Sequence, residues 1–167
     1  MDRTDPPPGP LRAADDEARA LARRLLAEAR FAALAAIDHA TGAPAISRIA
    51  LLAGPDGGGP VSLISRLAGH AANLAADPRC ALLLGEPGPK GDPLTHPRLS
   101  LSCLAEPLPR EHPAHGPLRD HWLRLVPKAG LYVDFADFGF QRFRIVSAAL
   151  NGGFGRAWRM TPEDLSP

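Results

Sequence analysis

The stretch FAALAAIDHATGAPAISRIALLAGPDGGGPVSLIS, residues 31–65, decides the fold class. It holds three mostly apolar runs, residues 31–38, 45–53 and 61–65, separated by two segments rich in Gly and Pro. Short apolar runs bounded by turn residues are typical of β-strands. Strands that follow one another through short turns pair antiparallel. The stretch therefore predicts a meander of three antiparallel strands.

The rest of the chain extends this pattern. Residues 79–86, 98–108 and 139–150 are three further strand-like runs, and residues 15–30, 67–77 and 117–126 have the spacing of short amphipathic helices. Strands follow strands without the crossover helices that a parallel sheet needs. We predict a mainly β (α+β) fold: a small antiparallel barrel of about six strands with helices packed outside.

Length and composition bound the function. The chain has 167 residues, 45% hydrophobic and 22% charged, which suits one domain with an apolar core. We expect a disordered lead-in over residues 1–14, the domain over residues 15–160 and a tail over residues 161–167. A net charge of +1 gives no indication of a nucleic-acid partner.

The compartment is predicted from three features. The chain has no run of 18 uncharged apolar residues, so no membrane span is expected, and its N-terminus lacks the apolar core of a signal peptide. Cys80 and Cys103 each lie in an apolar strand-like run, where buried free thiols are expected. These features predict a cytoplasmic protein.

Polar side chains crowd the turn between the run at 61–65 and the helix that follows. Ser65 offers a hydroxyl, Arg66 a full charge and His70 a ring N–H, and the backbone amides of residues 67–69, including Leu67 and Gly69, point at the same turn. A helix N-terminus of this kind can hold an anion. In the alternative interpretation, Ser65 only supports the turn and His70 is solvated.

Arg48 interrupts an otherwise apolar run. Its guanidinium matches a phosphate or a carboxylate, and a hairpin would place it one strand away from Ser65. The alternative is an edge-strand arginine that faces water. Near the C-terminus, Arg156 and Trp158 follow paired glycines and could cover an aromatic ligand, or the segment could form a tight turn.

Other motifs are negative. GPDGGGP, residues 54–60, lacks the Gly-Lys-Ser/Thr ending of a phosphate loop and is interpreted as a hairpin loop. The spacing of the histidines does not favour a metal site. No residue is assigned to catalysis from the pattern.

The order of several segments nevertheless resembles one family. Residues 22–84, GDPLTHPRLSLSCLAE (91–106), GLYVDFADF (130–138) and NGGFGRAW (151–158) are similar to the pyridoxamine 5′-phosphate oxidase-like split-barrel proteins. The nearest branch is that of the HugZ-type haem-utilisation proteins. The resemblance implies a six-stranded antiparallel split barrel that forms a homodimer and binds FMN at the subunit interface.

The same resemblance assigns roles to residues. Arg48 matches the arginine of the first phosphate-binding strand, and Ser65 matches the polar residue that ends the next strand. His70 stands where flavin-binding oxidases carry a lysine, and Ala53 stands where they carry a second one. The motifs that bind pyridoxamine phosphate, or the haem iron of HugZ-type proteins, are not matched near the C-terminus.

We therefore expect an FMN-binding redox protein, leaning towards a flavin-dependent oxidoreductase, that acts on a small substrate. The alternatives are a haem-binding protein and a non-catalytic flavin carrier.

Overall fold

The computed structural model describes residues 11–153 and 155–166. Its strands are β1 Arg12–Ala13, β2 Phe31–Ile37, β3 Pro44–Ala50, β4 Val61–Ser65, β5 Arg79–Leu84, β6 Arg98–Leu108, β7 Phe138–Asn151 and β8 Ala157–Met160. The helices are α1 Asp16–Glu28, α2 Gly69–Ala76, α3 His115–Leu125 and α4 Pro162–Leu165, with 3₁₀ turns η1 Pro93–Thr95 and η2 Pro127–Leu131.

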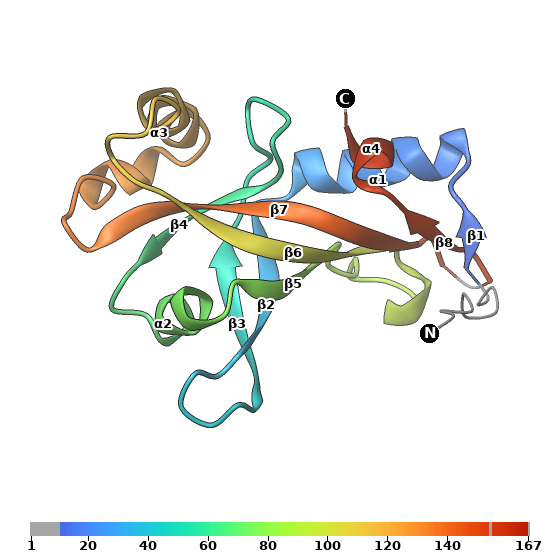
Figure 1. Ribbon diagram of the computed structural model, residues 1–167. Coiled ribbons are helices and arrows are strands. Elements are labelled where there is room, and N and C mark those ends of the chain that lie inside the picture. Colours follow the sequence, from blue (N-terminus) through green and yellow to red (C-terminus); the bar gives the residue numbers. More distant parts are fainter. Residues whose placement is uncertain (1–10, 154, 167) are drawn as a thin grey trace, which may run out of the picture.

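These strands form one open, strongly bent sheet (Figure 1). The order is β1-β8-β7-β6-β5-β2-β3, and β4 pairs with β7 off this path. All pairs are antiparallel except β1 with β8. The mainly β split-barrel fold is confirmed. The sheet has two strands more than predicted. β1 and β8 were not predicted because they are short and contain charged residues, so neither shows an apolar run in the sequence.

The predicted meander is correct for β2 and β3 and wrong for β4. β2 pairs with β3 along its whole length, from Phe31 opposite Ala50 to Ile37 opposite Pro44. β4 touches the end of this hairpin through a single bridge, Leu52 to Val61, and then pairs with β7. Four of the five β4 side chains are buried, so both faces of this strand must be covered by other parts of the protein. Pairing with β7 allows this burial. β3 and β4 consequently separate (Figure 1).

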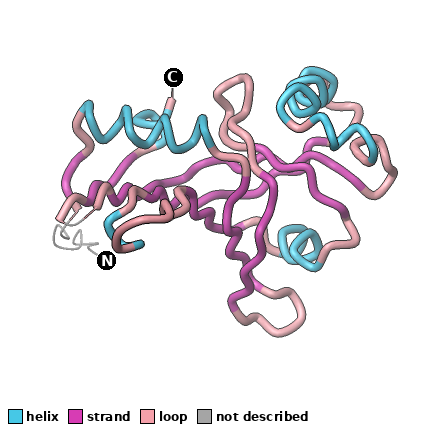
Figure 2. Tube along the Cα trace, turned by 180° about the vertical axis from the view of Figure 1, so that it is seen from behind, coloured by secondary structure: helices cyan, strands magenta, loops and turns pink. Residues whose placement is uncertain are grey.

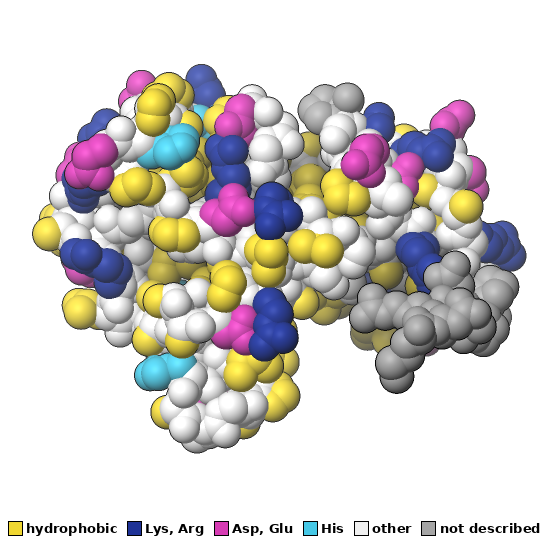
Figure 3. Space-filling model, viewed as in Figure 1, with side chains coloured by type: hydrophobic (Ala, Val, Ile, Leu, Met, Phe, Trp, Pro, Cys, Tyr) yellow, Lys and Arg dark blue, Asp and Glu magenta, His cyan; other side chains and the backbone are white. Residues whose placement is uncertain are grey.

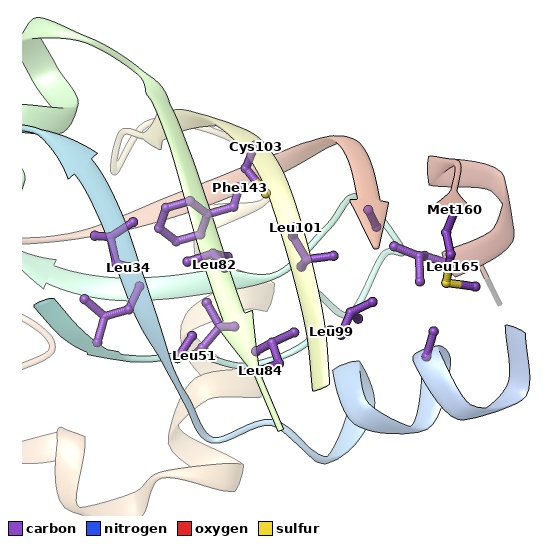
Figure 4. Close-up of a cluster of buried hydrophobic side chains, with 14 of the residues drawn as sticks. Leu34, Leu51, Leu82, Leu84, Leu99, Leu101, Cys103, Phe143, Met160 and Leu165 are labelled. Atoms are coloured by element: carbon purple, nitrogen blue, oxygen red, sulfur yellow. The ribbon is translucent and has the colours of Figure 1, made fainter. Parts of the chain in front are cut away.

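The main core fills the interior of the bent sheet (Figure 4). Leu34, Leu82, Leu101 and Phe143 are each at most 1% exposed and lie on β2, β5, β6 and β7. Burying a side chain of this size stabilises the fold by about 1.5–3 kcal/mol. Helix α1, two residues shorter at its end than expected, closes one end through Ala18 and Ala22. Figure 2 shows it lying along the sheet.

A second core lies under α3. Trp122 and Phe140 meet edge to face at 5.8 Å, with Leu52, Val61 and Leu118 around them. The two cores share the walls of β4 and β7, because Ile64 and Leu63 point to opposite sides of β4. α2 and the start of β7 lie where the two cores meet, and a cavity is present there.

Both cysteines are free, as predicted; Cys103 is buried as expected, whereas Cys80 is only half-buried. Burial raises the pKa of the Cys80 thiol to about 11 and that of Cys103 to about 12. Arg12 and Ala13 of the expected lead-in form β1, while residues 1–10 lie outside the described part. Among the described helices, none is both long and apolar enough to cross a membrane.

Candidate functional site

One face of the β2–β3–β5 region is turned away from the core and left open. Arg48 of β3 lies opposite Ala33 of β2, which lies opposite Leu83 of β5. Because strand residues alternate between faces, these three side chains share one side of the sheet. Ile46 is 78% exposed there, and Phe31 and Leu83 are 40% and 45% exposed. The outer face is therefore flat, apolar and uncovered in one chain. Hydrophobic side chains over the β2–β3 hairpin are visible in Figure 3.

Arg48 is the positive charge of this outer face. Its guanidinium carbon lies 5.3 Å from the centre of the Phe31 ring, a cation–π contact within the usual range. Its Nη2 is 3.9 Å from Glu86 Oε1, and 75% of the side chain is exposed. An ion pair this long and this exposed contributes little to the stability of the fold. The guanidinium is therefore held at one edge of an apolar surface with its N–H donors open to a ligand.

Ser65, at the end of β4, already has a strong partner. Its hydroxyl donates to Asp137 Oδ2 at 2.6 Å and accepts from the backbone N–H of Leu67 at 3.2 Å. The Leu67 side chain is 85% exposed. Ser65 thus holds the turn as the structural interpretation expects, and it brings a carboxylate into the predicted anion site.

The start of α2 carries the other predicted groups. Gly69 is its first residue, and Ala68 at the N-cap provides no side-chain hydrogen bond, so the first-turn amides have no side-chain partner. Burial lowers the pKa of His70, which lies half-buried in this first turn. His70 is consequently neutral at pH 7, when one ring nitrogen donates and the other can accept or bind a metal.

The Arg66 side chain points away from Ser65 and the first turn of α2. Its backbone N–H donates to Asp137 O at 2.7 Å, and its Nη2 donates to Ala136 O. The guanidinium lines a different cavity, between α2 and the start of β7. Arg66 and Ser65 are neighbours in a strand-like segment, so their side chains leave it on opposite sides.

Arg156 and Trp158 lie at the other end of the sheet, beside β1 and α1 (Figure 1). Arg156 forms an ion pair with Glu17 at 2.6 Å and lies 5.3 Å from the centre of the Trp158 ring. Trp158 is 3% exposed, and its Nε1 donates to Asp15 Oδ2 at 3.3 Å. Within one chain, these two residues are not brought to Arg48 and Ser65. Their contacts are those of a tight turn that joins β7 to β8.

Sequence reasoning missed the two carboxylates beside the predicted anion site. Glu86 follows β5 in a Pro- and Gly-rich loop, and Asp137 precedes β7 in a segment of mixed character. Asp137 lies within the family-like segment 130–138, which carries no assigned role, and Glu86 belongs to no recognised motif; both are far in sequence from the groups they face. Only the pairing of β4 with β7 places Asp137 beside Ser65.

These positions determine which anions suit the site. A phosphate at Ser65 would meet the Asp137 carboxylate at the same hydroxyl. Arg48 is not one strand away from Ser65 as expected, because β4 pairs with β7 and not with β3, and the acid nearest to Arg48 is Glu86. Like charges at such distances oppose binding of a doubly charged group. The residues therefore fit an FMN phosphate only in part. A flat apolar ligand with a singly charged carboxylate fits the outer face and Arg48 better.

Comparison with known proteins agrees with the fold. Residues 18–146 match the family model described as pyridoxamine 5′-phosphate oxidase. Among curated proteins, none matches the chain. A haem-binding protein from Mycobacterium smegmatis is 31% identical with a TM-score of 0.79, over 92% of this chain and 61% of that one. A protein of unknown function from Agrobacterium tumefaciens is 34% identical with a TM-score of 0.78, over 92% and 62%.

An FAD-binding protein from Mesorhizobium loti shares the fold, with 19% identity and a TM-score of 0.59 over 75% of this chain and 87% of that one. One of these structural neighbours is described as haem-binding and one as FAD-binding. The chain spans about three fifths of the length of the M. smegmatis and A. tumefaciens proteins. The family match covers most of the chain and agrees with the split-barrel topology. The chain belongs to the pyridoxamine 5′-phosphate oxidase family.

Proposed function

We propose that the protein binds haem on the outer face of β2, β3 and β5. The observation that carries the proposal is Arg48 at the edge of an exposed apolar surface formed with Phe31, Ile46 and Leu83. Haem is planar and largely apolar with carboxylates at its edge. Its plane would cover the apolar side chains, and Arg48 would hold a carboxylate with a charge-assisted hydrogen bond.

The local charges favour this ligand over a phosphate ester. Each of the two haem carboxylates carries one negative charge, fewer than a phosphate ester, and the Arg48 side chain is 75% exposed and can receive one of them. A phosphate at the start of α2 would have to compete with Asp137 for Ser65. The 31% identical haem-binding protein supports the same choice.

A histidine nitrogen commonly holds the iron of haem in proteins. His70, in the first turn of α2, is the histidine that we propose for this role, and its lowered pKa leaves the ring neutral at pH 7, the form that can bind a metal. No residue is assigned to catalysis. Bound haem would supply redox chemistry at the iron, while this chain's residues bind and orient it.

A second copy of the chain would cover what the ligand leaves open. Ile37, together with the part of Ile46 that the ligand does not cover, extends the apolar outer face along the β2–β3 hairpin beyond Arg48. Exposed apolar patches of this kind are commonly protein interfaces. We therefore propose a homodimer in which the outer faces of two chains approach each other and enclose the cofactor between them.

FMN is the second candidate, and a specific observation favours it. The first turn of α2 has no side-chain cap, so the amides near Gly69 and His70 can receive a phosphate oxygen. Flavin-dependent redox chemistry on a small substrate would then follow, in agreement with the family match. Asp137 and Glu86 are the features that weaken this candidate.

The two ligands are distinguished by titrating the purified protein with haem and with FMN, followed by visible absorbance and calorimetry. We expect saturable haem binding with a shifted Soret band and much weaker FMN binding. Arg48→Ala should weaken haem binding at least tenfold, the loss of a charge-assisted hydrogen bond of about 1.5–3 kcal/mol. Arg24→Ala, on an exposed position of α1, is the matched control. His70→Ala should change the Soret position.

If the protein binds FMN tightly in a manner that depends on Arg48 and does not bind haem, FMN rather than haem is the ligand. Binding of neither ligand, or haem binding indifferent to both Arg48 and His70, would contradict the proposed site.

A further inference from the structure

A separate cavity of about 570 Å³ lies between α2, the end of β6 and the start of β7. Its floor is apolar and comes from three strands and a helix, through Ile64, Leu74, Leu108, Phe138 and Phe140. Cavities of this size hold ordinary small ligands. Figure 3 shows hydrophobic side chains in a recess in this region, with basic side chains on the surrounding surface.

The cavity differs from the outer face in its position. Ile64 and Arg66 line it, whereas Ser65, between them in the sequence, points to Asp137. None of the outer-face side chains Phe31, Ile46 and Arg48 is among its lining residues. A ligand in this cavity would therefore leave the proposed haem site accessible.

Two arginines give the cavity a positive charge. Arg66 Nη2 donates to Ala136 O, and Arg110 Nη2 donates to Phe135 O at 2.8 Å. Neither guanidinium lies within ion-pair distance of a carboxylate among residues 11–153 and 155–166. A guanidinium has five N–H donors, so both retain donors for a ligand. Glu111 is the only acidic residue that the structure describes in the lining, which leaves a net charge of +1.

We infer that this cavity binds a small amphipathic monoanion, with an aromatic or branched aliphatic body on the apolar floor and one carboxylate between Arg66 and Arg110. The net charge of +1 matches one carboxylate, and a doubly charged group would be opposed by Glu111. The inference is independent of the ligand proposed for the outer face.

Gly139 provides a way to fill the cavity without disturbing the sheet. It lies on β7 opposite Ile64, it lines the cavity, and a Cβ at this position would have no heavy atom within 4 Å. Its φ is not in the left-handed region, so other residues can take its place. A large side chain there should occupy ligand space rather than core space.

The test uses a matched pair of probes, 1-naphthoate and its neutral analogue 1-naphthamide, in calorimetric titrations of the full chain. We expect naphthoate to bind the cavity with an affinity that Arg48→Ala, which removes the cation of the outer face, leaves unchanged, and we expect weaker binding of naphthamide. Arg110→Gln should weaken naphthoate about tenfold and change naphthamide less than twofold, because only the anion uses the charge. Gly139→Phe should weaken both probes at least tenfold. Arg24→Gln is the control that removes a remote surface charge.

Melting temperatures of the variants show whether they fold. If Arg110→Gln fails to fold, Gly139→Phe and the difference between the two probes still test the cavity. Naphthoate binding unaffected by Gly139→Phe, or naphthoate and naphthamide binding with equal affinity to the wild type, would overturn the inference. So would displacement of naphthoate by saturating haem or FMN, because it would assign the probe to a site proposed for one of those two ligands.

Discussion

Ser65 and Asp137 are 72 residues apart in sequence, yet the Ser65 hydroxyl donates to Asp137 Oδ2 at 2.6 Å. This contact joins the turn before α2 to the start of β7. It occupies the one hydroxyl expected to bind a phosphate, and it brings a negative charge to that position. The contact is thus the main reason for favouring a carboxylate-bearing ligand on the outer face.

Replacing this carboxylate tests its effect on phosphate binding. Asp137→Asn keeps a hydrogen-bond acceptor for Ser65 and removes the charge. We expect FMN affinity to rise about fivefold or more, corresponding to roughly 1 kcal/mol of relieved repulsion, with haem affinity changed less than twofold. Asp120→Asn, an exposed acid on α3, serves as the control in the same calorimetric titrations. Equal FMN affinity in the wild type and Asp137→Asn would show that the carboxylate does not oppose phosphate.

The proposed dimer depends on the most exposed apolar side chain of the outer face. Ile46→Asp places a charge at the centre of the proposed contact, where burying it without a partner is costly. Sedimentation velocity should show a dimer for the wild type and a monomer for Ile46→Asp at the same concentration. Leu131→Asp, equally exposed but near α3, should leave the dimer intact. A wild-type monomer at all concentrations would contradict this arrangement.

Glycines at two hairpins allow a matched test of close packing. Gly59 has φ +101°, and a Cβ there would lie 2.5 Å from Phe143 O. Gly42 has φ +72°, and a Cβ there would meet no atom within 4 Å. Gly42→Ala should lower the free energy of unfolding by about 1 kcal/mol, from backbone strain alone. Gly59→Ala should lower it by more than about 2 kcal/mol, because the clash adds to the strain. Similar losses in urea denaturation would show that the β3–β4 loop can move aside.

Acid sensitivity is predicted at the end of α2. The Arg79 guanidinium donates to the Asp77 carboxylate and lowers its pKa from 3.8 to about 2. A carboxyl with a lowered pKa in the folded state adds stability that is fully present above pH 3.8 and is lost as the pH falls towards 2. An NMR titration should place the Asp77 pKa near 2 in the wild type and closer to 3.8 in Arg79→Gln. Unchanged titration in that variant would mean that the backbone amide of residue 79, not its side chain, sets the pKa.

The predictable parts of the fold are those set by local sequence. The six longer strands and α2 follow from apolar periodicity and from Gly and Pro near their ends, and α1 follows from its apolar periodicity and its acidic first turn. The pairing of β4 with β7 could not be predicted, because it depends on burial of both faces of β4 rather than on the turn that precedes it. α4, with four residues, is too short to leave a periodic signal.

Of the three cations predicted for the candidate site, only the position of Arg48 on an open face could be anticipated from the sequence, and the neighbouring acids could not. Arg48 is recognisable because a charge interrupts an apolar strand, and the side chain does lie on an open apolar face. Asp137 and Glu86 reach the site only through long-range strand pairing, so their residue types gave no local signal. Arg66 illustrates the remaining limit: its proximity to Ser65 in sequence does not determine the side of the segment on which its guanidinium lies.

In the proposed complex, a planar ligand covers the outer face beside Arg48. Methyl NMR signals of Ile46 and Leu83, recorded with and without one equivalent of haem, test this placement most directly, with exposed Leu131 as the internal reference. We expect large shifts or broadening for Ile46 and Leu83 and an unchanged signal for Leu131. Unperturbed Ile46 and Leu83 signals in the haem-saturated protein would contradict the account.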